Sequence, residues 1–397
     1  MNMSQKDRNM PMREKNNFSD IVDQARAWRH DFHAHPELGY LEYRTSTVVA
    51  ELLESFGLAV VTGLGGTGVV ATLARGSGPF IGLRADMDAL PLQELGSPDY
   101  KSTNAGCMHA CGHDGHTAIL LATAKYLCGD TNFKGNVHFI FQPAEETGAG
   151  ARKMIEDGLF EKFPMVAVYG LHNWPSLKEG LIAVNPGAMM ASQDTFEICI
   201  SGSGAHAAMP EKGIDPVMIA AQLISALQTI TSRRISPLDS VVLSVTMVEA
   251  GSAYNVIPQT ATIKGTVRCL DQTVREQVEN MIRSMATSFP VAFGGTGSVI
   301  YREGYPVTKN DPACAARVRD VGVALGGADC VEWNGPASMA SEDFAFMLQA
   351  CPGAYFWLGA NRDGNAMPLH HPHYDFNDQV IASGIQVFER LAKSYQS

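Results

Sequence analysis

The chain has 397 residues, more than one hydrophobic core usually serves, so two domains are expected. Hydrophobic residues make up 45% and charged residues 18%, which is ordinary for a globular protein with a sizeable core. The formal net charge of -11 argues against a nucleic-acid partner, because an acidic surface repels phosphate backbones. No apolar run approaches the roughly 20 residues of a membrane span, so no membrane partner is expected.

The N-terminal segment is polar and mixed in charge, without the apolar stretch of a signal peptide. It is interpreted as a disordered leader before a helix that starts near Ser19. The eight cysteines are scattered and do not form the pattern of a disulfide framework. Reduced thiols and a cytoplasmic location are therefore expected.

Apolar strands alternate with helical stretches along the first part of the chain. Strands are predicted at 80–86, 137–141 and 165–170, helices at 116–129 and 151–160, and a further buried strand at 354–359. This alternation predicts an α/β domain whose mostly parallel sheet is flanked by helices.

The middle of the chain has a different pattern. Strands are predicted at 195–202, 240–251, 260–270 and 298–304, and helices at 215–234 and 271–289. The order β-α-β-β-α-β is typical of a ferredoxin-like α+β fold. We therefore expect an inserted domain at 190–302 between two parts of the sheet domain, at 18–189 and 303–397.

Side chains that can bind metal follow four of the predicted strands. Asp86 and Asp88 follow the first, Glu145 and Glu146 the second, His172 the third, and His370, His371 and His373 the last. Ligands of open α/β sheets bind outside the carboxyl ends of the strands, so these side chains are expected at one edge. Taken singly, each histidine could instead be a hydrogen-bonded core residue or part of a polar loop.

The run from Gly106 to His116 places three histidines and Cys111 in a glycine-bearing loop before a helix. Thiolate and imidazole are zinc-type ligands. The amides at the start of the helix would also favour a thiolate at Cys111. The alternative is a loop whose histidines cap the following helix.

Glu145 and Glu146 close a buried strand. Adjacent residues of an extended chain point in opposite directions, so one carboxylate could bind metal while the other faces the substrate as a proton shuttle. The alternative is an acidic first helical turn that complements the helix dipole.

Several long motifs in the same order resemble the co-catalytic metal aminoacylase and carboxypeptidase superfamily. They are RHDFHAHPEL at 29–38, LRADMDALP at 83–91, MHACGHDGHTA at 108–118, FQPAEE at 141–146, LHNWP at 171–175, SGSGAHAAMP at 201–210, NVIP at 255–258, SEDFA at 341–345 and LHHPHYDFND at 369–378. The chain is most similar to the branch of hippurate hydrolases, N-acyl-amino-acid amidohydrolases and plant auxin-conjugate hydrolases. The resemblance spans nearly all of the chain after residue 20.

The resemblance implies two divalent metal ions per subunit and assigns their ligands. The metal ligands are Cys111, which bridges the ions, with His113, Glu146, His172 and His370, and Glu145 is the general base. The family pattern Leu-His-x-Pro selects His370 over His371. The thiolate favours zinc, whereas the other ligands leave manganese, cobalt and nickel open.

The resemblance also implies that the inserted domain is a lid and a dimerisation module, in a homodimer or homotetramer. His206 would then point toward a neighbouring subunit's metal centre and polarise the scissile carbonyl. Asn255 and Arg268 would hold the substrate carboxylate, for which a planar guanidinium is well suited. On composition alone, His206 is a loop histidine and Arg268 a solvated strand residue.

Other polar residues of the motifs are interpreted as supporting groups. Asp86 and Asp88 are expected to orient ligands, Glu342 and Asp343 to brace the metal loops, His109 and His116 to flank the site, and His33, His35 and Glu37 to be structural. A metal-binding histidine occupies the position of Asp86 in related branches.

The implied activity is that of a metal-dependent amidohydrolase. It would cleave the amide bond of N-acyl-L-amino acids, such as hippurate-like or N-acetyl conjugates, to a carboxylic acid and a free amino acid. Metal-activated water would attack, with Glu145 as the base. A dipeptidase or carboxypeptidase with the same centre is the alternative. A non-catalytic homologue would lack a ligand or the base, and a structural zinc site would be richer in cysteine.

Overall fold

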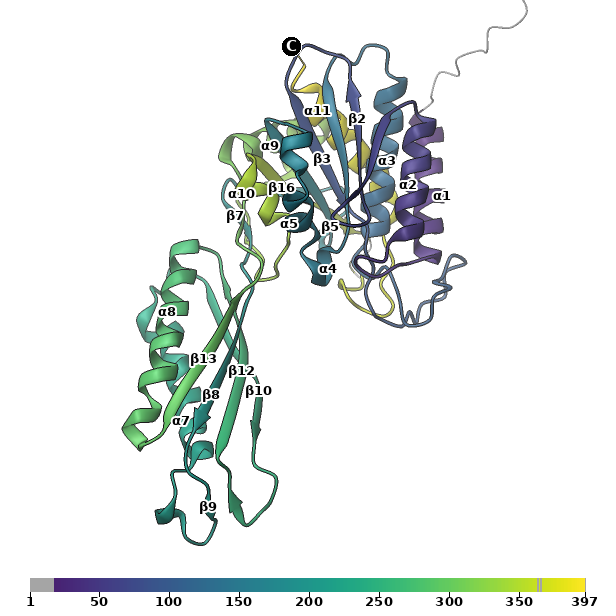
Figure 1. Cartoon of the computed structure of the whole chain (residues 1–397). Helices are drawn as coiled ribbons and strands as arrows, with labels where there is room; N and C mark the ends of the chain where they lie inside the picture. The colour runs from purple at the N-terminus through teal and green to yellow at the C-terminus, as the bar shows by residue number, and fades with distance from the viewer. Residues whose placement is uncertain (1–17, 363, 365, 397) are drawn as a thin grey trace, which may run out of the picture.

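The computed structural model describes residues 18–362, 364 and 366–396. The chain forms a larger body and a smaller, elongated one joined by narrow connections (Figure 1). The predicted leader at residues 1–17 lies outside the described residues, and the first helix covers Phe18–Ala34. Within the described part of the chain, no helix combines the length and apolar character needed to cross a membrane.

The larger body is built on an eight-stranded sheet with the order β1-β2-β4-β3-β5-β16-β6-β15. Its strands are β1 (Ala59–Leu64), β2 (Gly68–Ala74), β3 (Phe80–Asp86), β4 (Asn136–Gln142), β5 (Ala167–Lys178), β6 (Ile182–Val184), β15 (Val331–Trp333) and β16 (Gly353–Asn361). The central pairs β4–β3, β3–β5 and β5–β16 are parallel, and antiparallel pairs flank them. The predicted α/β fold with a mostly parallel sheet is confirmed.

Helices cover both faces of this sheet. They are α1 (Phe18–Ala34), α2 (Tyr43–Ser55), α3 (His113–Gly129), α4 (Glu145–Gly148), α5 (Gly150–Glu156), α6 (Leu159–Lys162), α9 (Pro312–Gly326), α10 (Ala345–Ala350) and α11 (Ile381–Lys393). Helices α1, α2, α3, α9 and α11 share one apolar core with the sheet, and α5, α6 and α10 pack on the other face. Helix α3 is buried on almost every side, so the loop before it reaches the protein interior.

The smaller body, called the lid below, contains a four-stranded antiparallel sheet with the order β10-β12-β8-β13. Its elements are β8 (Asp194–Ser201), β9 (Ala205–His206), α7 (Pro216–Thr229), β10 (Val241–Ala250), β11 (Val256–Ile257), β12 (Thr260–Cys269), α8 (Gln272–Ser288) and β13 (Thr296–Glu303). The order is consistent with a ferredoxin-like fold. A short antiparallel pair, β7 (Ala188–Met190) with β14 (Thr308–Lys309), lies where the two bodies meet. The domain limits at 190–302 stay a prediction.

Two predicted helices differ from the structure. The helix predicted at 151–160 is split into α5 and α6, because the chain passes through Gly158 with a φ of 91°. A left-handed residue of this kind ends a helix. The helix predicted at 215–234 ends at Thr229, and its last residues form a π-helical turn at Ile230–Arg234.

The strand predicted at 165–170 is also longer than expected. Strand β5 runs from Ala167 to Lys178, because the LHNWP motif pairs in parallel register with β16. His172 therefore lies inside a strand, and the prediction that it follows a strand end is wrong. The ladder of backbone hydrogen bonds fixes its position.

Asp194, at the start of β8, holds the base of the lid together. Its carboxylate accepts hydrogen bonds from Arg275 Nε at 2.9 Å, from the Tyr301 hydroxyl at 2.9 Å and from the Gly304 N–H at 3.1 Å. Asp194 has no exposed surface and Arg275 is only 4% exposed. Neither charge therefore has water as an alternative partner.

Asp194→Ala is expected to lower the free energy of unfolding by about 3–5 kcal/mol, because it leaves the buried Arg275 with only a 3.6 Å ion pair to the exposed Glu303. The matched control is Glu279→Ala, which breaks a more exposed pair with Arg283 on α8 and should cost less than about 1 kcal/mol. Urea unfolding followed by circular dichroism measures both. Equal losses for the two variants would contradict the assigned role of Asp194.

Candidate metal centre

The loop before α3 carries Cys111 and His113 into the interior at the carboxyl edge of the sheet. Gly112 lies between them with a φ of 94°, and a Cβ at this position would overlap the side chain of Asn173. Both the left-handed backbone and the close approach require glycine. The turn thereby directs the thiol and the imidazole to the same side.

The structure brings the five predicted metal ligands together as two groups that share one residue. Cys111, His113 and His172 each offer a ligand atom, and these atoms lie within 4.8 Å of one another. Cys111, Glu146 and His370 meet the same limit. The shared Cys111 sulfur therefore stands where a ligand common to two ions would stand.

Two buried atoms of these groups lack a hydrogen-bond partner. They are His113 Nε2 and Glu146 Oε1, which lie 3.9 Å apart. A buried polar atom without a partner is costly unless a ligand or ion satisfies it. Imidazole, carboxylate and thiolate are donors that suit divalent transition metals. The residues therefore fit the metal centre that the sequence predicts.

Hydrogen bonds at the second ring nitrogen orient two of the histidines. His113 Nδ1–H donates to the Asp88 carbonyl oxygen at 2.9 Å, and His172 Nδ1–H donates to the Asn173 carbonyl oxygen at 2.7 Å. Both bonds use Nδ1, so that Nε2 is the ring nitrogen that can bind a metal. His172 Nε2 lies 3.4 Å from the Cys111 sulfur.

The electrostatics of the centre favour a cation. Burial, Glu146 and Glu145 raise the pKa of the Cys111 thiol well above its usual value. Burial alone would lower the pKa of His113, but Asp86 and Asp88 outweigh it and raise that pKa to about 10. A metal ion would replace these protons and compensate the surrounding negative charge.

Arg84 is the hub of the charges beneath the centre. It lies on β3, has no exposed surface, and its Nη1 binds Asp86 at 2.7 Å. Its Nη2 binds Glu342 at 2.9 Å and Asp343 at 3.2 Å. One guanidinium thus ties β3 to the loop before α10, as expected if Glu342 and Asp343 brace the site.

Glu145 and Glu146 do not lie in an extended chain, so the prediction that they point in opposite directions as strand residues is wrong. They form the first turn of α4, after Ala144 turns the chain with a φ of 52°. The Glu145 carbonyl oxygen accepts a hydrogen bond from the Tyr305 hydroxyl at 2.6 Å. Burial and the neighbouring Glu342 raise the pKa of Glu145 well above its usual value. A buried carboxyl of this kind can hold a proton near neutral pH.

The C-terminal turn presents His370 and not His371. His370 has a φ of 64°, and its Nε2 lies 3.4 Å from Glu146 Oε1. The His371 ring instead accepts a hydrogen bond from the His373 N–H at 3.1 Å. This geometry agrees with the choice of His370 in the sequence pattern.

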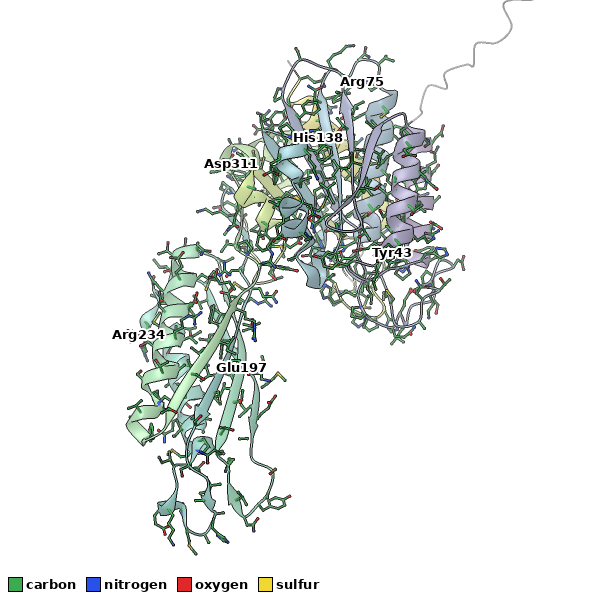
Figure 2. All side chains as sticks on the ribbon, viewed as in Figure 1. Tyr43, Arg75, His138, Glu197, Arg234 and Asp311 are labelled. Atoms are coloured by element: carbon green, nitrogen blue, oxygen red, sulfur yellow. The ribbon has the colours of Figure 1, made fainter. Side chains whose placement is uncertain are left out.

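Two other buried histidines, His138 and His116, are not among the candidate ligands, and their neighbours differ from those of the ligands. His138, labelled in Figure 2, lies near the opposite end of β4 from Glu145 and stacks on Phe80 with ring centroids 4.5 Å apart. His116 bonds to Asp86 and Asn173 behind the centre, at 2.6 Å each.

The histidines of the first motif are held away from the ligands. His33 Nδ1–H donates to Asp114 at 2.8 Å, and Arg29 binds Asp375 and Asp378 at 2.9 Å each. These bonds tie α1 to the loop that carries His370. Glu37 accepts hydrogen bonds from the backbone N–H groups of Arg44 and Thr45 at the start of α2. His35 bonds to the Asp31 carbonyl oxygen. His109 is buried beside the loop that carries Cys111 and His113.

The three lid residues that the resemblance assigns to the substrate, His206, Asn255 and Arg268, lie in two separate places. Arg268 Nη1 donates to Ser341 at 2.9 Å, which holds it beside the larger body. His206 lies on the exposed β9, whose partner β11 follows directly after Asn255. Strand β9 lies at the end of the lid farthest from the larger body (Figure 1). Within one chain, His206 and Asn255 are thus far from the metal ligands.

A cavity of about 440 Å³ opens at the centre. Cys111, Glu145, Glu146, His172 and His370 all line it. Ser341 also lines it, so the Arg268 guanidinium stands at its border. Four of the five candidate ligands and the candidate base therefore face one space that a small substrate can enter, and His113 lies behind its lining.

Residues 82–394 match the peptidase family M20/M25/M40. The chain belongs to this family. The match covers most of both bodies and includes every predicted metal ligand. The resemblance drawn from the motifs is confirmed.

Individual M20 relatives are similar over almost their full length. A hippurate hydrolase from Campylobacter jejuni is 42% identical, and the alignment covers 95% of this chain and 97% of the relative. An N-acetyl-L-cysteine deacetylase from Bacillus subtilis is 41% identical, and the alignment covers 95% of this chain and 89% of the relative. A solved structure from Bacillus subtilis is described as a dinuclear metal binding peptidase of the M20 family. It is 34% identical with a TM-score of 0.83, and the match covers 95% of this chain and 98% of that chain.

Sequence reasoning missed two buried charged groups that support this M20 site, Arg84 and Glu42. The signal for Arg84 was available, because a lone arginine inside an otherwise apolar strand needs a buried partner. Glu42 gave no such signal. Its Oε1 accepts from the Ala144 N–H at 2.8 Å and its Oε2 from the Thr67 hydroxyl at 2.5 Å. Glu42 thereby holds the strained residue that precedes Glu145.

Glu42 should make stability depend on pH. Burial and Asp88 raise its pKa to about 7 against the opposing Thr67 hydrogen bond. The folded chain thus keeps a proton that the unfolded chain releases near pH 4.5. The stabilising contribution is complete below about pH 4.5 and is lost as the pH rises through about 7.

Glu42→Gln is therefore expected to raise the free energy of unfolding on the order of 2 kcal/mol at pH 8 and to change it little at pH 4. The amide can still accept from Ala144 and donate to Thr67. Glu42→Ala, which removes both bonds, should destabilise at either pH. Thermal unfolding at the two pH values measures this, and a Glu42→Gln variant less stable than the parent at pH 8 would contradict the sign.

Proposed function

We propose that this chain is a metal-dependent amidohydrolase that cleaves the amide bond of N-acyl-L-amino acids. The observation that carries the proposal is the pair of ligand groups sharing Cys111, with the buried Glu145 on the same cavity. The hippurate hydrolase and the deacetylase among the M20 relatives support this substrate class. The products are a carboxylic acid and a free amino acid.

Two divalent metal ions per subunit are proposed, held by Cys111, His113, Glu146, His172 and His370. The dinuclear metal binding described for the Bacillus subtilis relative supports the number of ions. When bound, the ions lower the pKa of water and polarise a carbonyl group. Zinc is proposed first because of the thiolate ligand, with manganese, cobalt and nickel as alternatives.

Glu145 is proposed as the general base and acid. Its carboxylate takes a proton from the attacking water and delivers it to the leaving nitrogen of the amide. A raised pKa suits both transfers, because the group can hold the proton between them. The Tyr305 bond to its backbone keeps the short helix α4 in place during the exchange.

Arg268 is proposed to bind the substrate carboxylate. It is half-buried at the cavity border, where Ser341 and Gln193 hold one of its nitrogens at 2.9 and 3.3 Å. The remaining donors of the guanidinium are available for a planar carboxylate. Such an anchor would place the amide of the substrate over the metal ligands.

The lid is proposed to form a homodimer, or a homotetramer built from such dimers, so that His206 and Asn255 reach the partner's cavity. Strand β10 is an edge of the lid sheet, and its Val242, Met247 and Val248 are exposed. An apolar edge strand is a surface that another strand can pair with. Exposure of His206, far from its own metal ligands, also favours a role in the partner.

A cytoplasmic location is proposed because the centre needs a reduced thiol. All eight cysteines are free, and Cys111 is buried. Oxidation of Cys111 would remove the ligand shared by the two groups. A reducing compartment protects it.

A dipeptidase or carboxypeptidase activity is the second candidate. It is favoured by the peptidase description of the Bacillus subtilis relative. The same base and carboxylate anchor would serve a dipeptide. Comparing kcat/KM on N-acetyl, N-benzoyl and dipeptide substrates separates the two functions.

Glu145→Gln is expected to lower kcat about 100-fold or more while both metals stay bound, because the amide cannot accept the proton of water. Glu156→Gln, an exposed carboxylate on α5, is the matched control and should keep full activity. Elemental analysis and kinetics on N-acetyl and N-benzoyl amino acids are run on the same samples. Near-normal activity of metal-loaded Glu145→Gln would rule out this base.

Mixing two inactive variants tests the dimer. His206→Ala and Glu145→Gln are each expected to be inactive, but a dimer of one of each has one complete site. Free subunit exchange should restore about a quarter of the parent activity, since half of the dimers are mixed and each has one working site. No recovery, with mixed dimers demonstrated by mass spectrometry, would contradict the role of His206 in the partner.

A further inference from the structure

Arg268 is a half-buried cation without a counter-ion of its own. Another arginine of the lid, Arg275, is bound to the carboxylate of Asp194. Arg268 forms no ion pair among the described residues, and its hydrogen-bond partners there are the uncharged Ser341 and Gln193. Burial lowers the pKa of Arg268, and Asp194, already bound to Arg275, opposes this only in part. The guanidinium can therefore take an anion that the chain itself does not supply.

A closed ring of three hydrogen bonds holds one nitrogen of this guanidinium. Arg268 Nη1 donates to Ser341 Oγ at 2.9 Å and to Gln193 Oε1 at 3.3 Å. Ser341 Oγ donates to the same Gln193 oxygen at 2.7 Å. Within the described residues, Arg268 Nη2 and Nε make no hydrogen bond, so this pair of donors remains for a carboxylate.

The ring joins the two bodies at their narrow connection (Figure 1). Ser341 belongs to the larger body, Arg268 to β12 of the lid, and Gln193 to the segment that leads from β7 to β8. The Gln193 N–H donates at 2.9 Å to the carbonyl oxygen of Tyr305, on the segment that returns from the lid. Gln193 is thus held by both connections, and through it the guanidinium is held against the larger body.

Ser341 has a fixed place relative to the candidate base. It lines the cavity that Glu145 also lines. Two residues further along the chain, the Asp343 N–H donates to Glu145 Oε1 at 3.4 Å. The ring therefore sets how far Arg268 stands from the end of a bound substrate that reacts.

Neither partner of Arg268 in the ring carries a charge. A carboxylate in place of the Gln193 amide would bind the guanidinium as an ion pair, and it would compete with a carboxylate of the substrate. The amide oxygen orients the guanidinium without neutralising it. The choice of glutamine at this position therefore bears directly on which substrates bind.

We propose that Gln193 and Ser341 are positioning residues that hold Arg268 uncompensated at the cavity border, and that they thereby set the preference for substrates with a free carboxylate. The inference rests on the proposed amidohydrolase function and on the anchoring role of Arg268. Both residues act through the guanidinium. Their effect should therefore vanish on a substrate whose carboxylate is replaced by a neutral amide.

Gln193→Glu tests the role of charge, because it replaces one amide by a carboxylate of nearly the same size. In the metal-loaded variant, KM on N-acetyl-L-methionine should rise about tenfold or more with little change in kcat, since loss of uniform binding raises KM alone. On N-acetyl-L-methioninamide, which has no carboxylate, kcat/KM should stay within about threefold of the parent. Gln277→Glu changes an exposed glutamine on α8; it is the matched control and should equal the parent on both substrates.

Ser341→Ala tests the geometry of the ring without adding a charge. Loss of the hydroxyl should raise KM on the acid about threefold or more and leave the amide substrate unaffected. Ser341→Thr keeps the hydroxyl and should restore the parental KM. In an Arg268→Gln background, Ser341→Ala should cause no further loss on the acid, because no guanidinium remains to be positioned. Thermal unfolding shows that each variant is folded.

Three outcomes separate this inference from the proposals on which it rests. If a folded Gln193→Glu or Ser341→Ala variant shows no rise of KM on the acid, or loses as much on the amide as on the acid, the positioning role is refuted. If the parent cleaves acid and amide equally well, Arg268 anchors no carboxylate; the inference falls with that role, and the amidohydrolase function stands. If the metal-loaded parent cleaves no N-acyl amino acid, the proposed function itself fails.

Discussion

The metal centre depends on a buried excess of negative charge at the carboxyl edge of the large sheet. Arg84 compensates Asp86, Glu342 and Asp343 from within β3, and its full burial makes each of these bonds strong. Glu145 and Glu146 face the adjacent cavity, and His113 and His370 lie 3.9 and 3.4 Å from Glu146 Oε1. The thiol of Cys111 keeps its proton in this field unless a positive ion is present. Metal binding and the ionisation of the ligands are thus one coupled event.

Backbone strain helps to place the ligands. Gly112, Ala144 and His370 all have positive φ, and each lies at or beside a ligand or the base. A non-glycine residue in this region is strained and persists only where its surroundings hold it. Glu42 supports Ala144, and the Ala110 carbonyl oxygen accepts the His370 N–H at 2.8 Å. The three turns let segments distant in sequence present their side chains to one cavity.

Division of the molecule into two bodies puts the candidate metal ligands and Arg268 on different bodies. The candidate ligands come from the larger body, which is a sheet packed between helices. Arg268 comes from the lid, and its bond to Ser341 spans the junction between the bodies.

Sequence alone predicted the α/β fold, the family and the residues that gather at the centre, because strand ends and motif spacing are local properties that survive folding. It gave His370 over His371 through the Leu-His-x-Pro pattern, and the turn geometry agrees. It could not give the direction of Glu145 and Glu146, since a left-handed Ala144 converts the expected extended chain into a helical turn. It also missed Glu42, because a buried carboxylate on a loop has no periodic signal. The resemblance implied a shared Cys111, but only tertiary structure, by bringing β3, α3, β5 and the C-terminal turn together, put its sulfur near both groups of side chains and Arg84 beside them.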